Sequence, residues 1–357
     1  MKQYRHTYAE INLKQIQNNV SKIIKKYSGY KYYIGVVKAD SYGHYDYKVV
    51  KSIIKGGCNY LAVSSLEEAL QIRKKEKEIP ILCLGVILPE YLEICEKENI
   101  TITIPSFEYV MEIPKHLAKN LKCHLKIDTG MNRLGMKEQD EIDYTYSILK
   151  ERGFEIEGIY THIYQASNKK KTKQQFERFS HLTKNIPLEE IPIVHIFQSE
   201  TLSNFPKLPY VTGCRLGIIM YGFTNDTSLN LKSTFSLKSQ IIQIKYLKKG
   251  ETVGYNGTYQ ALKDETIGIV AIGYADGIIR KNTGRTVYIN GKEYPIIGNI
   301  CMDMLMVRID NTVSLYDTVE ILKDIEDINR VSKYLKTIPY EVLCTISKRV
   351  PRIYIRK

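Results

Sequence analysis

The chain carries the apolar run Tyr33-Ile34-Gly35-Val36-Val37, which ends in Lys38 and is followed by Ala39-Asp40-Ser41-Tyr42-Gly43-His44. The run has the composition of a buried strand, so it delivers an amine from the protein interior into a loop. Burial removes hydration from an ammonium group and favours the neutral amine, which can attack an aldehyde. The alternative is a strand-end lysine that simply reaches solvent. The residues further along the chain favour the first interpretation.

Eight apolar runs of this kind lie between residues 30 and 220, separated by amphipathic segments. They are Tyr33–Ala39, Tyr60–Ser64, Ile79–Leu84, Ile100–Ile104, Lys122–Ile127, Glu155–Ile163, Pro192–Phe197 and Val211–Leu216. Ser65 precedes a segment with Glu67 and Glu68 in its first turn, which is the pattern of a helix N-terminus. Eight strand-helix units predict an α/β fold with an N-terminal (β/α)8 TIM-like barrel, whose active site lies at the carboxyl ends of the strands.

Several polar residues end these predicted strands. Lys38 ends the first, His162 the sixth, Ser199 follows the seventh, and Arg215 with Gly217 ends the eighth. A single strand-end His or Arg more often pairs with a carbonyl or a carboxylate than with a ligand. Because parallel barrel strands end on one face, however, all of these residues are expected on the same rim.

The pattern changes after Asn225 to β-branched runs separated by turn signals. These runs are Ser239–Tyr246, Thr266–Ile272, Thr286–Tyr294, Leu305–Ile309 and Thr318–Leu322. Asn290-Gly291 predicts a type I′ hairpin turn, and a helix is expected near Ile325 to Leu335. We therefore predict a barrel domain at residues 1–228 and a C-terminal, mostly β domain at residues 229–357.

Composition excludes several classes of protein. The 357 residues are 43% hydrophobic and 25% charged, which fits a folded chain with a sizeable core. No apolar stretch is long enough to span a bilayer and the first residues lack a signal-peptide pattern, so a cytoplasmic protein is expected. The net charge is +13, but no short basic run is interleaved with aromatic residues, which argues against nucleic-acid binding. The seven scattered cysteines fit free thiols, and the histidines have no metal-ligand spacing.

Several motifs together resemble the alanine racemase family, barrel enzymes that use pyridoxal 5′-phosphate (PLP). The motifs span nearly the whole chain and occur in the family's order. They are residues 37–44 (Val-Lys-Ala-Asp-Ser-Tyr-Gly-His), residues 126–135 (Lys-Ile-Asp-Thr-Gly-Met-Asn-Arg-Leu-Gly), residues 215–222 (Arg-Leu-Gly-Ile-Ile-Met-Tyr-Gly), residues 272–277 (Ile-Gly-Tyr-Ala-Asp-Gly) and residues 301–303 (Cys-Met-Asp).

The resemblance implies a two-base racemase. Lys38 matches the lysine that holds the cofactor and works on one face of the substrate, and Tyr255 matches the base of the opposite face. Racemisation removes a proton from one side of a carbon and returns one to the other, so one base per face is the direct solution. Packing is the alternative role for any one of the 28 tyrosines.

The resemblance also assigns roles around the cofactor ring. Arg215 matches the arginine that donates a hydrogen bond to the pyridine nitrogen, and His162 a histidine that supports this arginine. Arg133 matches the arginine near the cofactor's phenolic oxygen and the substrate carboxylate. Lys126 aligns with a lysine that is carbamylated in some members, where it orients that arginine.

The remaining implied contacts are to phosphate, substrate and a partner subunit. Tyr42, Ser199 and the backbone amides of Gly217 and Ile218 match the phosphate-binding groups. Met302 and Asp303 match residues that the partner subunit supplies to the substrate carboxylate. Because Tyr255 and Met302 cross the interface in this family, a homodimer is implied.

Two positions depart from the family pattern. Gln198 replaces a common asparagine, and Lys348 replaces a tyrosine that touches the phosphate and crowds the substrate. The second change leaves room for a hydroxyl, so a serine racemase of the kind found in vancomycin-resistance operons is the alternative to alanine. A non-catalytic PLP carrier lacks the second domain, and a barrel decarboxylase lacks the motifs at 126–135 and 215–222.

Overall fold

The computed structural model describes residues 4–117 and 121–357, which form two compact units. The barrel unit comprises residues 16–41 and 46–231. The β unit comprises residues 4–15, 42–45 and 232–357. The two units divide after residue 231, and two short segments, residues 4–15 and 42–45, cluster with the C-terminal strands.

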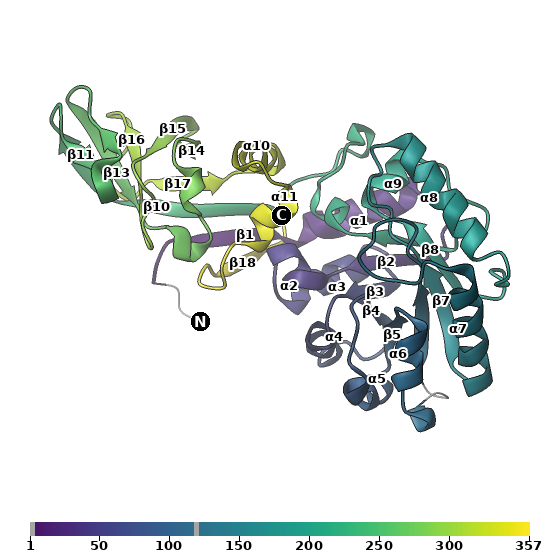
Figure 1. The fold of residues 1–357 in the computed structure, drawn as a ribbon. Helices are drawn as coiled ribbons and strands as arrows, with labels where there is room; N and C mark the ends of the chain where they lie inside the picture. The colour runs from purple at the N-terminus through teal and green to yellow at the C-terminus, as the bar shows by residue number, and fades with distance from the viewer. Residues whose placement is uncertain (1–3, 118–120) are drawn as a thin grey trace. The chain divides into compact units, whose positions relative to one another are not determined.

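Eight parallel strands close the barrel, as the apolar runs predict (Figure 1). They are β2 (Tyr32–Val36), β3 (Tyr60–Val63), β4 (Ile81–Cys83), β5 (Ile100–Ile104), β6 (Lys122–Lys126), β7 (Glu155–Tyr160), β8 (Ile193–Phe197) and β9 (Gly213–Leu216). The closing pair joins β2 to β9, with Ile34 opposite Arg215. The strands are almost wholly buried, which explains why they read as continuous apolar runs.

Helices follow the barrel strands and lie outside them in Figure 1. They are α3 (Tyr47–Lys55), α4 (Leu66–Arg73), α5 (Leu92–Lys97), α6 (Phe107–Glu112), α7 (Gln139–Arg152), α8 (Lys169–Leu182) and α9 (Ser199–Asn204), with 3-10 turns at Pro89–Tyr91, Lys115–Leu117, Ile218–Tyr221 and Thr227–Leu229. Helix α4 begins as predicted, because the Ser65 side chain accepts a hydrogen bond from the Glu68 amide. Helices α1 (Leu13–Lys26) and α2 (Lys38–Gly43) each begin in one unit and end in the other.

The β unit contains an eight-stranded sheet in the order β13-β16-β15-β14-β17-β10-β1-β18. Its strands are β1 (Tyr8–Asn12), β10 (Phe235–Leu247), β13 (Glu265–Val270), β14 (Thr286–Ile289), β15 (Lys292–Ile297), β16 (Leu305–Ile309), β17 (Thr318–Leu322) and β18 (Arg352–Ile355). A small ribbon joins β11 (Thr252–Val253) to β12 (Tyr259–Gln260), and the helices are α10 (Ile325–Leu335) and α11 (Pro339–Cys344), with 3-10 turns at Tyr255–Gly257, Tyr274–Asp276 and Arg280–Asn282. The hairpin β14–β15 turns at Asn290 and Gly291, whose φ values of 50° and 79° confirm the predicted type I′ geometry.

Strand β1 ties the first residues of the chain into this sheet. It pairs antiparallel with β10 and parallel with β18. Local sequence patterns do not predict this pairing, because the strands that pair with β1 lie more than 200 residues away along the chain.

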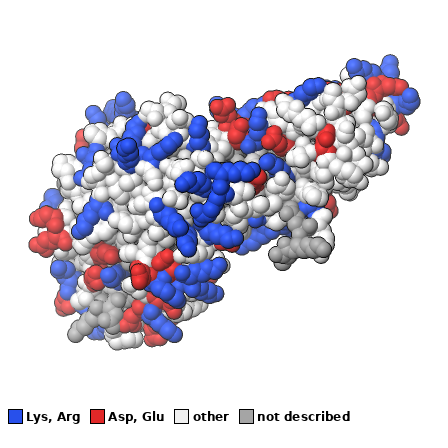
Figure 2. Space-filling model, turned by 180° about the vertical axis from the view of Figure 1, so that it is seen from behind, with Lys and Arg blue, Asp and Glu red and all other residues white. Residues whose placement is uncertain are grey.

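The surface carries charge of both signs. Figure 2 shows Lys and Arg side chains distributed over the drawn face, with Asp and Glu side chains among them. Among the described residues, no helix has the length and apolar character needed to cross a membrane. All seven cysteines are free thiols.

Candidate active site at the barrel rim

Lys38 is presented by an unusual backbone turn directly after β2. The next four residues, Ala39 to Tyr42, have φ values of 51–55°, a run of left-handed conformations that costs about 1–2 kcal/mol per residue. Two contacts hold the turn: the Ser41 amide donates to the Val37 carbonyl at 2.9 Å, and the Ala39 amide donates to Glu68 at 2.7 Å. Strain that is maintained in this way is characteristic of functional sites, and here it fixes the backbone that carries the Lys38 amine.

Arg215 lies buried at the end of β9 and is anchored by the barrel. Its Nη1 donates to His195 Nδ1 at 2.6 Å and to the His195 carbonyl at 2.7 Å. Its Nη2 donates to the carbonyls of Thr161 at 2.7 Å and Ile196 at 3.3 Å. A guanidinium has five N–H donors, so within the described chain the Nε donor remains for a ligand. Burial lowers the pKa of Arg215 to about 10, which leaves it cationic at neutral pH.

The histidine that is hydrogen-bonded to Arg215 is His195, whereas the family resemblance places His162 in this role. His195 Nδ1 accepts from Arg215, so its proton is on Nε2, which faces His124 Nδ1 at 2.9 Å. His124 Nε2 in turn faces Glu157 at 3.3 Å. Burial and the charge of Arg215 hold the pKa of His195 well below its usual value. Two neutral imidazoles therefore connect Arg215 to a carboxylate through the barrel interior.

Glu157 anchors the far end of this chain of hydrogen bonds. It accepts from the Tyr60 hydroxyl at 2.5 Å and from Thr101 at 3.0 Å. Burial opposes ionisation, but the hydrogen bonds from His124, Tyr60 and Thr101 hold the pKa of Glu157 below its usual value. An ionised Glu157 fixes the tautomer of His124 and, through His195, the orientation of Arg215.

His162 instead marks a strongly positive region. Burial is the largest cause that lowers its pKa to about 3, and the charges of Arg215, Arg133, Lys126 and Lys38 lower it further. These four basic side chains therefore act on one neutral imidazole. Such a site favours an anionic ligand.

Ser199 and Gly217 contact each other at the ends of β8 and β9. The Gly217 amide donates to Ser199 Oγ at 3.0 Å, and Ile218 begins the 3-10 turn that follows. Gln198 has a structural explanation, because its side chain accepts from the Glu200 amide at 2.8 Å and caps helix α9. Hydroxyl and amide donors grouped at a barrel rim suit a phosphate.

Lys126 is a buried amine on β6. Its Nζ donates to the Ile127 carbonyl at 2.9 Å and lies 5.1 Å from the centre of the Tyr160 ring. Burial and the charge of Arg215 lower its pKa to about 7. A large share of this side chain is therefore a neutral, nucleophilic amine at physiological pH.

The other predicted site residues belong to the β unit. Tyr255 and Met302 have exposed side chains, at 69% and 52% respectively. Tyr42 is buried, with its ring centre 5.8 Å from that of Tyr340. Burial, followed by the influence of Tyr340, raises the pKa of Tyr42, so its phenol stays protonated and can donate. Lys348 lies over the Tyr45 ring at 5.6 Å.

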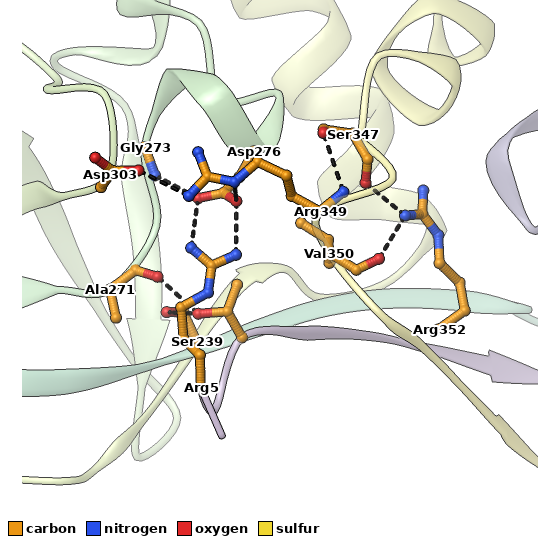
Figure 3. Close-up of polar contacts among 11 residues, drawn as sticks. Arg5, Ser239, Ala271, Gly273, Asp276, Asp303, Ser347, Arg349, Val350 and Arg352 are labelled. Carbon is orange, nitrogen blue, oxygen red and sulfur yellow. Dashed lines mark hydrogen bonds and ion pairs between the residues drawn. The ribbon is translucent and has the colours of Figure 1, made fainter. Parts of the chain in front are cut away.

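The motif at residues 272–277 contacts the loop that carries Met302 and Asp303 through its backbone, and Arg5 holds its Asp276 side chain. Arg5 donates to both Asp276 oxygens, at 3.0 and 2.6 Å, and Arg349 bonds Asp303 at 2.8 Å (Figure 3). The carbonyl of Met302 accepts from the Ala275 amide at 3.0 Å. The motif therefore has a structural role, and Arg349 occupies the Asp303 carboxylate.

Replacing Gly158 with alanine is expected to disrupt the hydrogen bonds that support Arg215. Gly158 lies opposite His124 across β6 and β7, and an added Cβ would come within 2.5 Å of the imidazole ring. We expect a loss of about 1–3 kcal/mol in the free energy of unfolding, measured by urea denaturation. In a His124→Ala background the same substitution should cost much less, and an equal cost in both backgrounds would contradict this account.

Comparisons with known proteins give one result along the whole chain. Residues 11–225 match the family model of the alanine racemase N-terminal domain, and residues 234–354 match that of the C-terminal domain. Alanine racemase 1 of Bacillus subtilis (strain 168) is 38% identical over 366 residues, which cover 99% of this chain and 94% of that protein. Alanine racemase of Geobacillus stearothermophilus is 35% identical over 368 residues, which cover 99% of this chain and 94% of that protein.

Comparisons with solved structures point to the same family. The alanine racemase of Bacillus anthracis with bound L-Ala-P has a TM-score of 0.91 at 32% identity, covering 100% of this chain and 96% of that one. The alanine racemase of Clostridium difficile 630 has a TM-score of 0.92 at 34% identity, covering 99% of this chain and 97% of that one.

Proposed function

Because the chain belongs to the alanine racemase family, we propose that it interconverts L- and D-alanine and that PLP is its cofactor. The reaction would supply D-alanine for peptidoglycan precursors, in the cytoplasm. The observation that carries the proposal is the hydrogen bonding of Arg215, whose four Nη protons are used by the barrel while Nε remains for a ligand. A buried arginine with one unused N–H can donate a hydrogen bond to the ring nitrogen of a heteroaromatic cofactor.

The residues of the barrel unit fit PLP. Lys38 provides the amine for its aldehyde, Arg215 the donor for its ring nitrogen, and Ser199 with the amides of Gly217 and Ile218 the donors for its phosphate. When bound, PLP withdraws electrons from the substrate's α-carbon and makes its proton removable. Because a guanidinium donates but does not release its proton, Arg215 leaves the ring nitrogen unprotonated, which limits that withdrawal and disfavours side reactions.

Two residues move the proton. Lys38 serves one face of the α-carbon and Tyr255 the other. Arg133, with the backbone N–H groups of Met302 and Asp303, is proposed to bind the substrate carboxylate, since the Asp303 side chain is paired with Arg349. The exposure of Tyr255 and Met302 suits residues that complete the site of a partner subunit, so we propose a homodimer with shared sites.

The substrate is tested by racemisation of L-alanine and L-serine, each in both directions, with the PLP-loaded protein and chiral chromatography. We expect alanine to be turned over much faster. Faster turnover of serine would assign the chain to serine, with Lys348 as the residue to replace by tyrosine. Loss of both activities, with PLP still bound, would favour a PLP carrier.

Lys126 is expected to carry a carbamate. A neutral amine adds to CO2 with loss of one proton, and the resulting anion can pair with Arg133. In protein equilibrated with 13C-bicarbonate, we expect one carbamate signal by 13C NMR that is absent in Lys126→Met and kept in Lys122→Met, a control on the same strand. Because the pKa of Lys126 is about 7, the signal should fall as the pH drops below 7 and the amine becomes protonated. A signal that survives Lys126→Met would exclude this site.

A further inference from the structure

A cavity of about 260 Å³ lies within the β unit. Its walls include Leu322 from β17, Val331 from α10, and Val342 and Ile346 from the segment that begins with α11. These four side chains are buried and apolar. Arg285 also lines the cavity and is only 5% exposed. The space therefore combines an apolar surface with one buried cation.

Three of the guanidinium donors of Arg285 are used by the protein. Nε donates to Asn282 Oδ1 at 2.6 Å, and Nη1 donates to the carbonyls of Thr286 at 3.0 Å and Ile321 at 3.1 Å. The buried Nη2 has no hydrogen-bond partner in the part of the chain that the structure describes. A buried donor without a partner is destabilising, so a ligand that accepts from Nη2 would recover that cost.

Arg285 is held as a cation. Burial lowers its pKa to about 10, and the nearby Asp327 acts in the opposite direction. Asp327 does not neutralise it, because this carboxylate pairs with Arg330 at 2.8 Å and accepts from the Lys323 amide at 3.0 Å. At neutral pH the cavity therefore contains a buried positive charge without a direct counterion among the described residues.

The rim of the cavity is polar and exposed. Lys281 and Lys336 lie there with Glu341. Two lysines against one glutamate favour the approach of an anion. The rim also indicates how a small solute would reach Arg285 from solvent.

We propose that this cavity binds a short-chain aliphatic monocarboxylate, with its carboxylate on Arg285 Nη2 and its alkyl group against Leu322, Val331, Val342 and Ile346. A single free guanidinium nitrogen matches a carboxylate better than a phosphate, whose additional charged oxygens would face apolar walls. The volume suits a small metabolite. None of the residues proposed for racemisation lines the cavity, so this site is independent of the proposed reaction.

The proposal is tested by titrating the PLP-loaded protein with isovalerate and following methyl NMR signals. We expect the signals of Val331, Val342 and Ile346 to shift and saturate. Isovaleramide, which has the same shape without the charge, should bind at least ~10-fold more weakly because a charge-assisted hydrogen bond is lost. Unchanged signals at these methyls, or equal binding of the amide, would overturn the proposal.

Two variants locate the site. Arg285→Gln should weaken isovalerate binding at least ~10-fold, and Arg308→Gln, an exposed arginine on β16, should not. Since Arg285 also has structural hydrogen bonds, Leu335→Phe provides a second test that keeps the arginine and fills the cavity. Its control is Leu262→Phe at an exposed leucine. Full binding by Leu335→Phe would contradict the proposed position.

Discussion

Replacement of Lys38 with alanine is expected to abolish racemisation, with a loss of at least ~10³-fold, and to abolish covalent attachment of PLP. Both effects follow from one amine, because Lys38 is proposed to hold the cofactor aldehyde and to move a proton on one face of the substrate. Lys38 directly precedes the left-handed run Ala39–Tyr42, which fixes the backbone that carries this amine.

Reduction with borohydride followed by peptide mass spectrometry measures the attachment. The wild-type protein should carry the reduced cofactor on Lys38, and the alanine variant should carry none. Lys31→Ala, at the other end of β2, is the matched control and should keep both attachment and activity. Cofactor fixed to another lysine in the variant, with activity retained, would show that Lys38 is misassigned.

The barrel could be predicted because each of its strands is buried on both faces. Such strands read as short apolar runs, and the positions of Lys38, Ser199 and Arg215 at their ends followed directly. The hairpin at Asn290-Gly291 and helix α10 were also predictable, because turn geometry and helical periodicity are local properties.

The support of Arg215 could not be predicted in the same way. His195 and His124 lie inside apolar strands, where a histidine gives no signal of the neighbour it meets across the barrel. The family resemblance places His162 in this role, whereas the hydrogen bond comes from His195, four positions before Ser199, on the next strand. A one-residue change in register alters which side chains face the barrel interior, and sequence patterns do not fix register this finely.

Long-range strand pairing was the second feature that could not be predicted from the sequence. Strand β1 and Arg5 belong to the β unit through β10, β18 and Asp276, all far along the chain. The left-handed turn after Lys38 was equally hidden, because Ala39, Asp40, Ser41 and Tyr42 include no glycine to indicate it. Both features depend on tertiary contacts that override local preference.

Replacing Tyr255 with phenylalanine is expected to slow proton transfer on one face of the substrate's α-carbon and to leave proton transfer on the other face. The change removes one hydroxyl from an exposed side chain, so the free energy of unfolding should change by less than about 0.5 kcal/mol. In D2O, exchange of the α-proton of L-alanine should fall by ~10²- to 10⁴-fold, while exchange of the α-proton of D-alanine, served by Lys38, should persist. Tyr259→Phe is the control in the same segment. Equal loss of both exchange rates would assign Tyr255 a structural role.

The same variant tests whether the site is shared between subunits. A Lys38→Ala subunit keeps Tyr255, and a Tyr255→Phe subunit keeps Lys38, so a mixed dimer contains one complete site only if Tyr255 crosses the interface. Each variant alone should be inactive in racemisation, and activity should appear when the two are unfolded together and refolded with PLP. If Tyr255 served its own subunit, every site in the mixture would lack one base and no activity would return, although the dimers would still form. Recovery therefore depends on subunit exchange and on both proton-transfer roles together.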